Sequence, residues 1–556
     1  MKYSLILNTP NENILTDIKP FEKSINAKYG NFSISMETKA VDYCTVSTFT
    51  VTGEGEAYLS VEGKYYEGVC CTFSGEKTKK GVYRQSPHNV QQWKINTSKE
   101  AVPMAGVLKD GEYEIIMSDN PAMSDNYTTQ ITDPENKKIC VCSGDNGEVY
   151  EGELTFDKYY HKITKEKPHV FTVVLFRSDA KDLNSMRKDV FYAIDKVFGE
   201  DGNKFHAICF SSNYMHYRRN EMGVSDYWII PGIEYCNTQY PRDAFWQSMI
   251  LPPEMAHQCY NGLYKGRCNY AENACIFIFW SYRNFINGYP YDKERLYDSL
   301  DYIKDHVKDN CYITGESKTL AFRSWYDICS FENDDCLTYN QGFFVLALMA
   351  LDKMEIEHPY DTEKAIEEYN NLFLEKEGYY PMSRKKPFMI TLDPTIGDLL
   401  AYIYFDRKIL NSENVKRHYK TSFNAARTDL GCKVTCRPDG SFCTLEDYSA
   451  YGKVNDELAT HTPGYYSWGG SYYIYEMLFH MDAYIHGAEN AEENLIWRSG
   501  IDFKLGGTYF EHINTVTGDA NKANQGWNAC IYALWQMLID KGVANDRFFR
   551  EMDKIL

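Results

Sequence analysis

The sequence lacks long apolar runs and any excess of positive charge. It has no stretch of about 18 apolar residues, so it predicts no membrane-spanning helix. The apolar patch at Leu5–Leu7 turns polar at once, without the longer apolar core and cleavage site of a secretory signal. Lys and Arg total 59 against 78 Asp and Glu, a formal net charge of -19 that repels nucleic acid and anionic membranes. These absences favour a cytoplasmic protein with a neutral ligand, and neither nucleic acid nor membrane as partner.

The cysteines form no recognisable framework. They number 17, and neighbours such as Cys70–Cys71 and Cys140–Cys142 are too close for ordinary disulfides. No paired Cys-x-x-Cys array occurs, and Cys432, Cys436 and Cys443 have no nearby histidine that would complete a zinc site. We therefore expect reduced thiols, no metal and no cofactor.

Aromatic residues are abundant, with 46 Tyr and 9 Trp making up most of a 15% aromatic fraction. Packing in cores must account for most of these rings, and only a few can serve as platforms for a ligand. The 556 residues exceed what one ordinary core accommodates, so we expect two domains.

The first third of the chain alternates between apolar and polar residues in short segments separated by turn residues. Period-two alternation with β-branched and aromatic residues predicts antiparallel strands, and turns such as Asp110-Gly111 separate them. The clearest segments are 32–36, 45–51, 57–61, 113–117 and 170–175. Residues 1–180 are therefore expected to form a β-sandwich.

After Ser178 the period changes to that of helices. Residues 182–195 predict a capped amphipathic helix, and we expect 181–214 to be a helical linker. Further helical segments are 243–263, 269–287, 293–308, 338–356, 362–375, 396–410, 465–486 and 524–541. Helices without intervening strands predict an (α/α)6 toroid over 215–556, which makes the fold multidomain with α and β parts.

Four loop segments combine aromatic rings with a carboxylate, a guanidinium group or glycines: 240–246, 324–327, 463–470 and 509–512. This mixture suits sugars, whose C–H faces stack on rings and whose hydroxyls need charged or amide partners. Taken singly, the acids Asp243 and Asp327 could be helix caps and Trp468 part of a tight turn. The joint occurrence favours a sugar site.

Three of these motifs resemble the glucoamylase family. Residues 510–529 have a Glu, then Thr-Gly, then a Trp opening a helix, which resembles the family's catalytic-base segment. Arg242–Asp243 resembles the pair that grips hydroxyls of the non-reducing sugar. Trp325, Tyr326 and Asp327, followed by an apolar helix, are similar to the segment that supplies the proton donor.

A sandwich, a linker helix and a barrel in this order also resemble bacterial glucoamylases and inverting disaccharide phosphorylases, within the six-hairpin glycosidase superfamily. The resemblance implies Glu511 as general base and Asp327 as general acid. The family places its acid directly after Trp, and here Tyr326 intervenes, so Glu332 is the alternative acid. The expected substrate-binding residues are Arg242, Asp243, Trp246, Trp325, Gln341, Tyr465, Trp468 and Trp527.

The expected function is an inverting glycoside hydrolase that removes a terminal sugar from an oligosaccharide or glycoside. Inversion needs a protonated carboxyl to donate to the leaving oxygen and a carboxylate to activate water, roughly 6.5–9.5 Å apart. An inverting phosphorylase, which uses phosphate instead, is the first alternative. A sugar epimerase would need paired histidines, and a non-catalytic carbohydrate-binding protein could dispense with both acids. A homodimer is compatible with the sequence.

Overall fold

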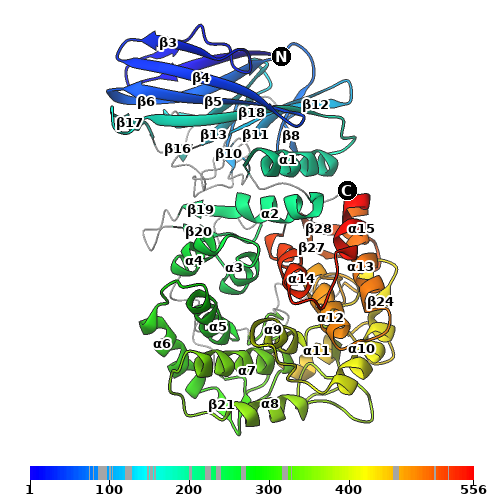
Figure 1. Cartoon of the computed structure of the whole chain (residues 1–556). Helices are drawn as coiled ribbons and strands as arrows, with labels where there is room; N and C mark the ends of the chain where they lie inside the picture. Colours follow the sequence, from blue (N-terminus) through cyan, green and yellow to red (C-terminus); the bar gives the residue numbers. More distant parts are fainter. Residues whose placement is uncertain are drawn as a thin grey trace. The chain divides into compact units, whose positions relative to one another are not determined.

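The computed structural model describes the chain in two compact units (Figure 1), Met1–Gly223 with Ile233–Thr238, and Val224–Gly232 with Gln239–Leu556. It describes all residues except 74, 79–80, 86–96, 99–101, 103, 119–127, 147–148, 151–153, 156–157, 199–202, 220–226, 233–238, 264–270, 316–322, 327–328, 455–461, 506–508 and 524. Within the described ranges, no helix has both the length and the apolar character needed to cross a bilayer.

The first unit contains two eight-stranded sheets. One sheet has the order β10-β9-β13-β14-β6-β1-β2, with β17 also on β6, and the other has the order β3-β4-β5-β18-β12-β11-β7-β8. The first sheet consists of β1 (Lys2–Asn8), β2 (Asn13–Leu15), β6 (Gly55–Lys64), β9 (Tyr83–Gln85), β10 (Thr97–Ser98), β13 (Thr129–Asp133), β14 (Lys138–Cys142) and β17 (His161–Ile163). The second consists of β3 (Ile25–Tyr29), β4 (Phe32–Val41), β5 (Cys44–Gly53), β7 (Val69–Thr72), β8 (Gly75–Glu76), β11 (Met104–Lys109), β12 (Glu112–Ser118) and β18 (His169–Ser178).

The five segments predicted as strands all lie within strands, namely β4, β5, β6, β12 and β18. Their pairing is antiparallel, for example between β4 and β5, as the alternating pattern requires. Buried side chains from both sheets form one core, including Leu59 and Val61 of the first and Phe49 and Val51 of the second. The short strands β15 (Val149–Tyr150) and β16 (Leu154–Thr155) form a separate hairpin.

Two helices complete this unit. The predicted helix after Ser178 is present as α1 (Leu183–Phe198), which contacts β5, β18 and α2 (Lys204–His216). Tyr192 of α1 stacks on Tyr43, with ring centroids 5.7 Å apart. Helix α1 lies within the range 181–214, α2 extends two residues beyond it, and the short strand β19 (Tyr217–Arg219) follows.

The second unit is built from a ring of helices (Figure 1). Helix α3 (Pro241–Gln247) contacts α5 (Asn273–Ile286), which contacts α7 (Thr338–Lys353), and α7 contacts α9 (Ile396–Phe405). Helix α9 contacts α12 (Tyr473–Ile485), and α12 contacts α14 (Cys530–Asp540). The short helix η3 (Gly526–Ala529), which leads into α14, contacts α3 and so closes the ring.

Helices α5, α7 and α12 are buried on nearly all sides, whereas α14 buries one face. Every residue of α7 from Thr338 to Leu351 is buried. Helices α7 and α9 approach so closely that a Cβ on Gly397 would lie 2.6 Å from the Cα of Gly342. Larger residues at these two glycines would force the helices apart.

A second helix follows each inner helix and buries one face only. Helix α10, for instance, buries Val415, His418, Tyr419, Ser422, Phe423 and Ala426, a spacing of three and four residues. The outer helices are α4 (Pro253–Asn261), α6 (Lys293–Lys304), α8 (Thr362–Asn370), α10 (Ser412–Ala426), α13 (Ala491–Leu505) and α15 (Arg547–Ile555). The remaining elements are α11 (Leu445–Tyr451), β20 (Tyr227–Ile229), β21 (Val307–Lys308), β22 (Cys311–Tyr312), β23 (Ile390–Thr391), β24 (Arg427–Thr428), β25 (Gly431–Cys432), β26 (Thr435–Cys436), β27 (Phe510–Ile513) and β28 (Ala520–Ala523).

Two helical predictions were wrong in extent. The segment 243–263 is two helices: α3 ends at Gln247, and α4 begins at Pro253, a first-turn position that proline tolerates. The segment 465–486 is helical only from Tyr473, since its beginning forms a turn with positive φ at Gly469.

Candidate functional site

The site lies where the inner helices of the second unit begin. Each inner helix starts at, or just after, a polar or aromatic side chain, and hydrogen bonds or ring contacts connect these side chains from one helix to another. The side chains are Arg242 and Asp243 (α3), Glu272 (α5), Tyr339 (α7), Asp393 (α9), Tyr472 and Tyr475 (α12), and Gln525 and Trp527 (α14).

Two polar pairs connect α3 to its neighbours in the ring. Arg242 donates from Nε to Oε1 of Glu272, whose side chain has no exposed surface. Gln525 donates from Nε2 to Oδ1 of Asp243 at 3.2 Å, and both residues are buried. Arg242 is therefore held by Glu272, and Asp243 by Gln525. Charged hydrogen bonds of this kind hold carboxylates and guanidinium groups in fixed orientations.

An aromatic cluster forms the adjacent part of the site. Trp325 stacks on Tyr475 with ring centroids 3.9 Å apart and an interplanar angle of 20°. Tyr475 also makes edge contacts with Trp527 at 5.8 Å and with Tyr339 at 6.3 Å. Two tryptophans predicted as ligand platforms, Trp325 and Trp527, thus meet on one tyrosine of α12.

Asp393 is a buried carboxyl that sequence reasoning missed. The indole Nε1 of Trp325 donates to its Oδ2 at 2.6 Å. Burial raises the pKa of Asp393, although the hydrogen bond from Trp325 acts in the opposite direction. No local motif could have identified it, because Asp393 precedes Pro394 in what resembles an ordinary turn.

Glu511 lies on strand β27, which pairs with β28 in a hairpin. Its side chain is buried, and its Oε2 is 3.8 Å from Nδ1 of His512. The His512 ring stacks on Tyr472 at 5.5 Å and meets Tyr465 edge-on at 4.8 Å. Since Tyr472 also contacts Trp325 edge-on at 5.5 Å, the Glu511 segment is continuous with the aromatic cluster.

A buried charged network supports β27. Arg498 donates to Glu476 from Nε at 2.7 Å and to Asp502 from Nη1, and all three side chains are fully buried. Ser471 donates to Oε2 of Glu476 at 3.1 Å, and the backbones of Ser471 and Ile513 exchange two hydrogen bonds of 2.9 Å. The network therefore contacts the strand through Ser471 at Ile513, two residues after Glu511.

Burial alone would raise the pKa of Glu476, but Arg498 and His480 act more strongly in the opposite direction. Together with the backbone N–H of Cys432, they lower it from its ordinary 4.5 to about 2.

Three other predicted residues make contacts typical of a core. Trp246 has no exposed surface and packs edge-on against Phe245 and Phe343. Gln341 donates to the backbone carbonyls of Asn310 and Ala365 and accepts from the backbone N–H of Tyr312. Trp468 is buried against Tyr448, with ring centroids 4.8 Å apart.

The two predicted acids of the donor segment have different places. Glu332 has an exposed side chain, while its backbone carbonyl accepts a hydrogen bond from Thr314. Asp327 lies outside the described residues, so the structure leaves its role a prediction. Its neighbours Trp325 and Tyr326 are part of the aromatic cluster, with ring centroids 4.0 Å apart.

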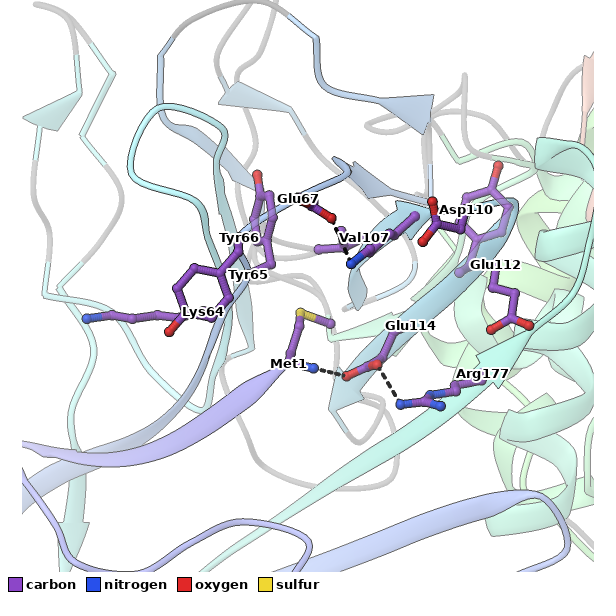
Figure 2. Close-up of a pocket in the computed structure, with 12 residues that line it drawn as sticks. Met1, Lys64, Tyr65, Tyr66, Glu67, Val107, Asp110, Glu112, Glu114 and Arg177 are labelled. Carbon is purple, nitrogen blue, oxygen red and sulfur yellow. Dashed lines mark hydrogen bonds and ion pairs between the residues drawn. The ribbon is translucent and has the colours of Figure 1, made fainter.

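A separate hollow of about 330 Å³ lies in the first unit (Figure 2). Several of its charged groups pair with one another. Glu114 accepts from the amino group of Met1 at 3.0 Å and pairs with Arg177 at 3.2 Å, and Lys109 pairs with Glu67 at 2.9 Å. None of the residues predicted from the sequence as site residues lines this hollow.

Comparisons with known proteins find no matching family model and no matching curated protein. Among solved structures, the chain is similar to a sialidase at 10% identity and a TM-score of 0.37, over 92% of this chain and 55% of that one. It therefore spans about half the length of the sialidase.

Two further solved structures cover part of the chain. A wild-type glycosidase is 10% identical, with a TM-score of 0.41 over 62% of this chain and 100% of its own. A GH63 mannosylglycerate hydrolase from Thermus thermophilus is 8% identical, with a TM-score of 0.37 over 60% of this chain and 100% of its own. The function proposed for the chain therefore rests on the residues of the site.

Proposed function

We propose that the chain is an inverting glycoside hydrolase that removes a terminal sugar from an oligosaccharide or glycoside. The observation that carries the proposal is the meeting of polar pairs, stacked rings and the Glu511 segment at the start of the inner helices. Sugars need this combination, because they present apolar C–H faces beside hydroxyls that require fixed hydrogen-bond partners.

The architecture we propose is a β-sandwich over 1–180, a helical linker over 181–214 and an (α/α)6 barrel over 215–556. Its support is the pair of sheets with a shared core and the closed ring of helices, each inner helix followed by an outer one. This is the architecture of the six-hairpin glycosidases that the sequence motifs resemble. A cytoplasmic location remains part of the proposal.

In the proposed reaction, water attacks the anomeric carbon while Glu511 takes its proton. The bond to the leaving oxygen breaks as Asp327, or in its place Glu332, donates a proton to that oxygen. The product sugar has the opposite anomeric configuration, and each carboxyl is restored by proton exchange with solvent. Glu511 suits the role of base because it is a buried carboxyl on a strand that the Arg498 network supports through Ser471 and Ile513.

Asp393 is a third carboxyl to be tested as the acid. Its burial favours the protonated form, which a general acid requires. Its hydrogen bond from Trp325 also gives it a simpler role, which is to orient the indole against Tyr475. We assign Asp393 this orienting role and keep Asp327 as the acid.

The other groups would bind the substrate. Arg242 and Asp243 have fixed orientations and would hydrogen-bond the hydroxyls of the terminal sugar, while Trp325 and Trp527 would contact its apolar face. Trp246, Gln341 and Trp468 would support the walls of the site, since their side chains already have partners in the core.

A screen of aryl glycosides and oligosaccharides, with NMR assignment of the first anomer released, tests the reaction. The expected product has the inverted configuration and is formed without inorganic phosphate. A requirement for phosphate, with release of a sugar phosphate, would instead establish the phosphorylase alternative. Retention of configuration would contradict the inverting mechanism.

The acid can be identified with the variants Asp327→Asn, Glu332→Gln and Asp393→Asn. The true acid variant should lose most activity on natural linkages and retain more on aryl glycosides with acidic phenols, because those leaving groups need little protonation. We expect this pattern for Asp327→Asn. The same pattern in Asp393→Asn would transfer the role to Asp393.

A further inference from the structure

Three buried side chains of the second unit converge at a place that the proposed reaction does not use. They are Asp398 of α9, and Asp482 and His486 at the C-terminal end of α12. One ligand atom of each lies within 4.8 Å of the others, and none of the three side chains has exposed surface.

Two of these side chains are held as metal ligands usually are. His486 hydrogen-bonds through Nδ1 to Oγ of Ser412 at 2.8 Å and through Nε2 to Oδ2 of Asp398 at 2.5 Å, and a bound ion would replace the second of these hydrogen bonds. Oδ1 of Asp398 accepts from the backbone N–H groups of Ile409 and Leu410. Ligating imidazoles and carboxylates typically have such a second partner, which fixes the ring and its tautomer.

Asp482 supplies an independent observation. Both of its carboxylate oxygens are buried and have no hydrogen bond of normal geometry among the described residues, and their polar neighbours are the Thr395 hydroxyl and the carboxyl of Asp398. Oδ1 faces Nε2 of His486 at 3.9 Å, so the carboxylate is aimed into the cluster. Two carboxylates that are buried together carry a large desolvation cost, which a cation between them would offset.

We propose that Asp398, Asp482 and His486 bind a divalent transition-metal ion, with Zn²⁺ as the first candidate. One imidazole nitrogen and two carboxylate oxygens are a donor set that Zn²⁺ accepts, and a water molecule or the nearby Thr395 hydroxyl would complete a tetrahedral site. The ion would connect α9 to α12. This site is structural and does not depend on the glycosidase proposal.

The spacing is compatible with small adjustments. Two ligand atoms that each lie about 2.0–2.2 Å from a tetrahedral Zn²⁺ are separated by roughly 3.3–3.5 Å. The observed separations from Nε2 of His486 are 2.5 Å to Asp398 and 3.9 Å to Asp482. Each separation therefore needs to change by about 1 Å or less to hold the ion.

The sequence predicts no metal, because its clustered cysteines lack a nearby histidine. Asp398 is separated by 84 residues from Asp482, so no short motif connects them. The cluster exists only because α9 and α12 are neighbours in the ring.

The test is the metal content of the full-length protein, measured by inductively coupled plasma mass spectrometry after chelation and reloading with Zn²⁺. We expect about one ion per chain and a rise of a few degrees in Tm on reloading. Asp482→Asn and His486→Gln should lower the content by about one ion per chain. His418→Gln is the matched control, because His418 is another fully buried histidine of this unit and lies outside the cluster.

The absorption spectrum of bound Co²⁺ distinguishes this site from one formed by cysteine thiolates. Co²⁺ bound to nitrogen and oxygen ligands gives visible d–d absorption without the thiolate charge-transfer band that cysteine ligands produce. We expect that spectrum for the parent and for His418→Gln.

Three outcomes would overturn the proposal: no ion retained and no change in Tm after reloading, only thiolate-bound Co²⁺, or unchanged metal content in a folded His486→Gln. The first would mean that a shared proton stabilises the two carboxyls. If the cluster variants do not fold, the metal content, Tm and Co²⁺ spectrum of the parent decide the question. Glycosidase activity does not enter the test, so failure here would leave the proposed function untouched.

Discussion

Glu511 is the side chain on which the proposed hydrolysis depends most directly. Glu511→Gln keeps the shape and hydrogen bonding of the side chain but cannot take a proton from water. We expect activity to fall by about 10²–10⁴ or more, measured as kcat/KM on the best substrate of the screen. The loss should persist on substrates with good leaving groups, because those relieve only the need for the acid.

Adding azide to Glu511→Gln gives a more specific test of this prediction. A small anion can replace activated water when the base is missing, and it should give a glycosyl azide of inverted configuration. Glu357→Gln, at an exposed position, is the control and should behave like the parent. Parental activity in Glu511→Gln would remove Glu511 from the mechanism.

Asp243 is predicted to bind a hydroxyl of the terminal sugar. It is buried and accepts from Gln525 at 3.2 Å, so its carboxylate is already oriented. Because hydrogen bonds to charged groups contribute roughly 1.5–3 kcal/mol, Asp243→Ala should lower kcat/KM by about one to two orders of magnitude. Circular dichroism should show an intact fold. Unchanged kinetics would mean that Asp243 only caps α3.

Strand β27 depends on the charged network beneath it. The pKa of Glu476 is lowered from 4.5 to about 2 in the folded chain, so this carboxylate stabilises the fold fully above about pH 4.5. Its contribution is lost as the pH falls from about 4.5 towards 2, because the unfolded chain takes up the proton first. The shift corresponds to about 3 kcal/mol near neutral pH.

Glu476→Gln tests this sign. It should destabilise the protein by about 3–5 kcal/mol at pH 7, because Arg498 stays buried but loses one of the two carboxylates with which it pairs. The difference in unfolding free energy between parent and variant, measured by denaturant titration, should shrink as the pH falls below about 4.5. A difference that stays constant with pH would contradict the lowered pKa.

The helices show which elements can be recognised from local patterns. The inner helices α5, α7, α9, α12 and α14 all lie in segments recognised by their apolar spacing. Of the outer helices, α4, α6 and α8 also lie in predicted segments, whereas α10, α13 and α15 do not, although α10 buries one regular face. The local pattern therefore identified the inner helices more completely than the outer ones.

The two units lead to a prediction for the whole molecule. The core of the first unit is formed from its own two sheets, so residues 1–223 expressed alone should fold. We expect a β-rich circular dichroism spectrum, near-UV signals from packed aromatic rings and a cooperative thermal transition. A fragment without near-UV signal would show that this core needs the second unit.

Sequence patterns were sufficient for the local properties of this chain. Period-two alternation identified β4, β5, β6, β12 and β18, because side-chain alternation is a property of the extended backbone itself. Short motifs likewise singled out Arg242, Asp243 and Trp325, and the structure connects all three to neighbouring inner helices or loops. Recognising these strands and motifs requires only a few adjacent residues.

The assignment of individual rings and acids required the packed molecule. Trp246 and Trp325 both belong to the segments that the sequence singled out, 240–246 and 324–327, yet one is enclosed by Phe245 and Phe343 while the other donates to Asp393. Asp393 and the cluster around Asp482 had no local signal at all. Burial, pKa and ligand geometry depend on groups brought together from distant parts of the sequence by the ring of helices, and a local pattern carries no information about those neighbours.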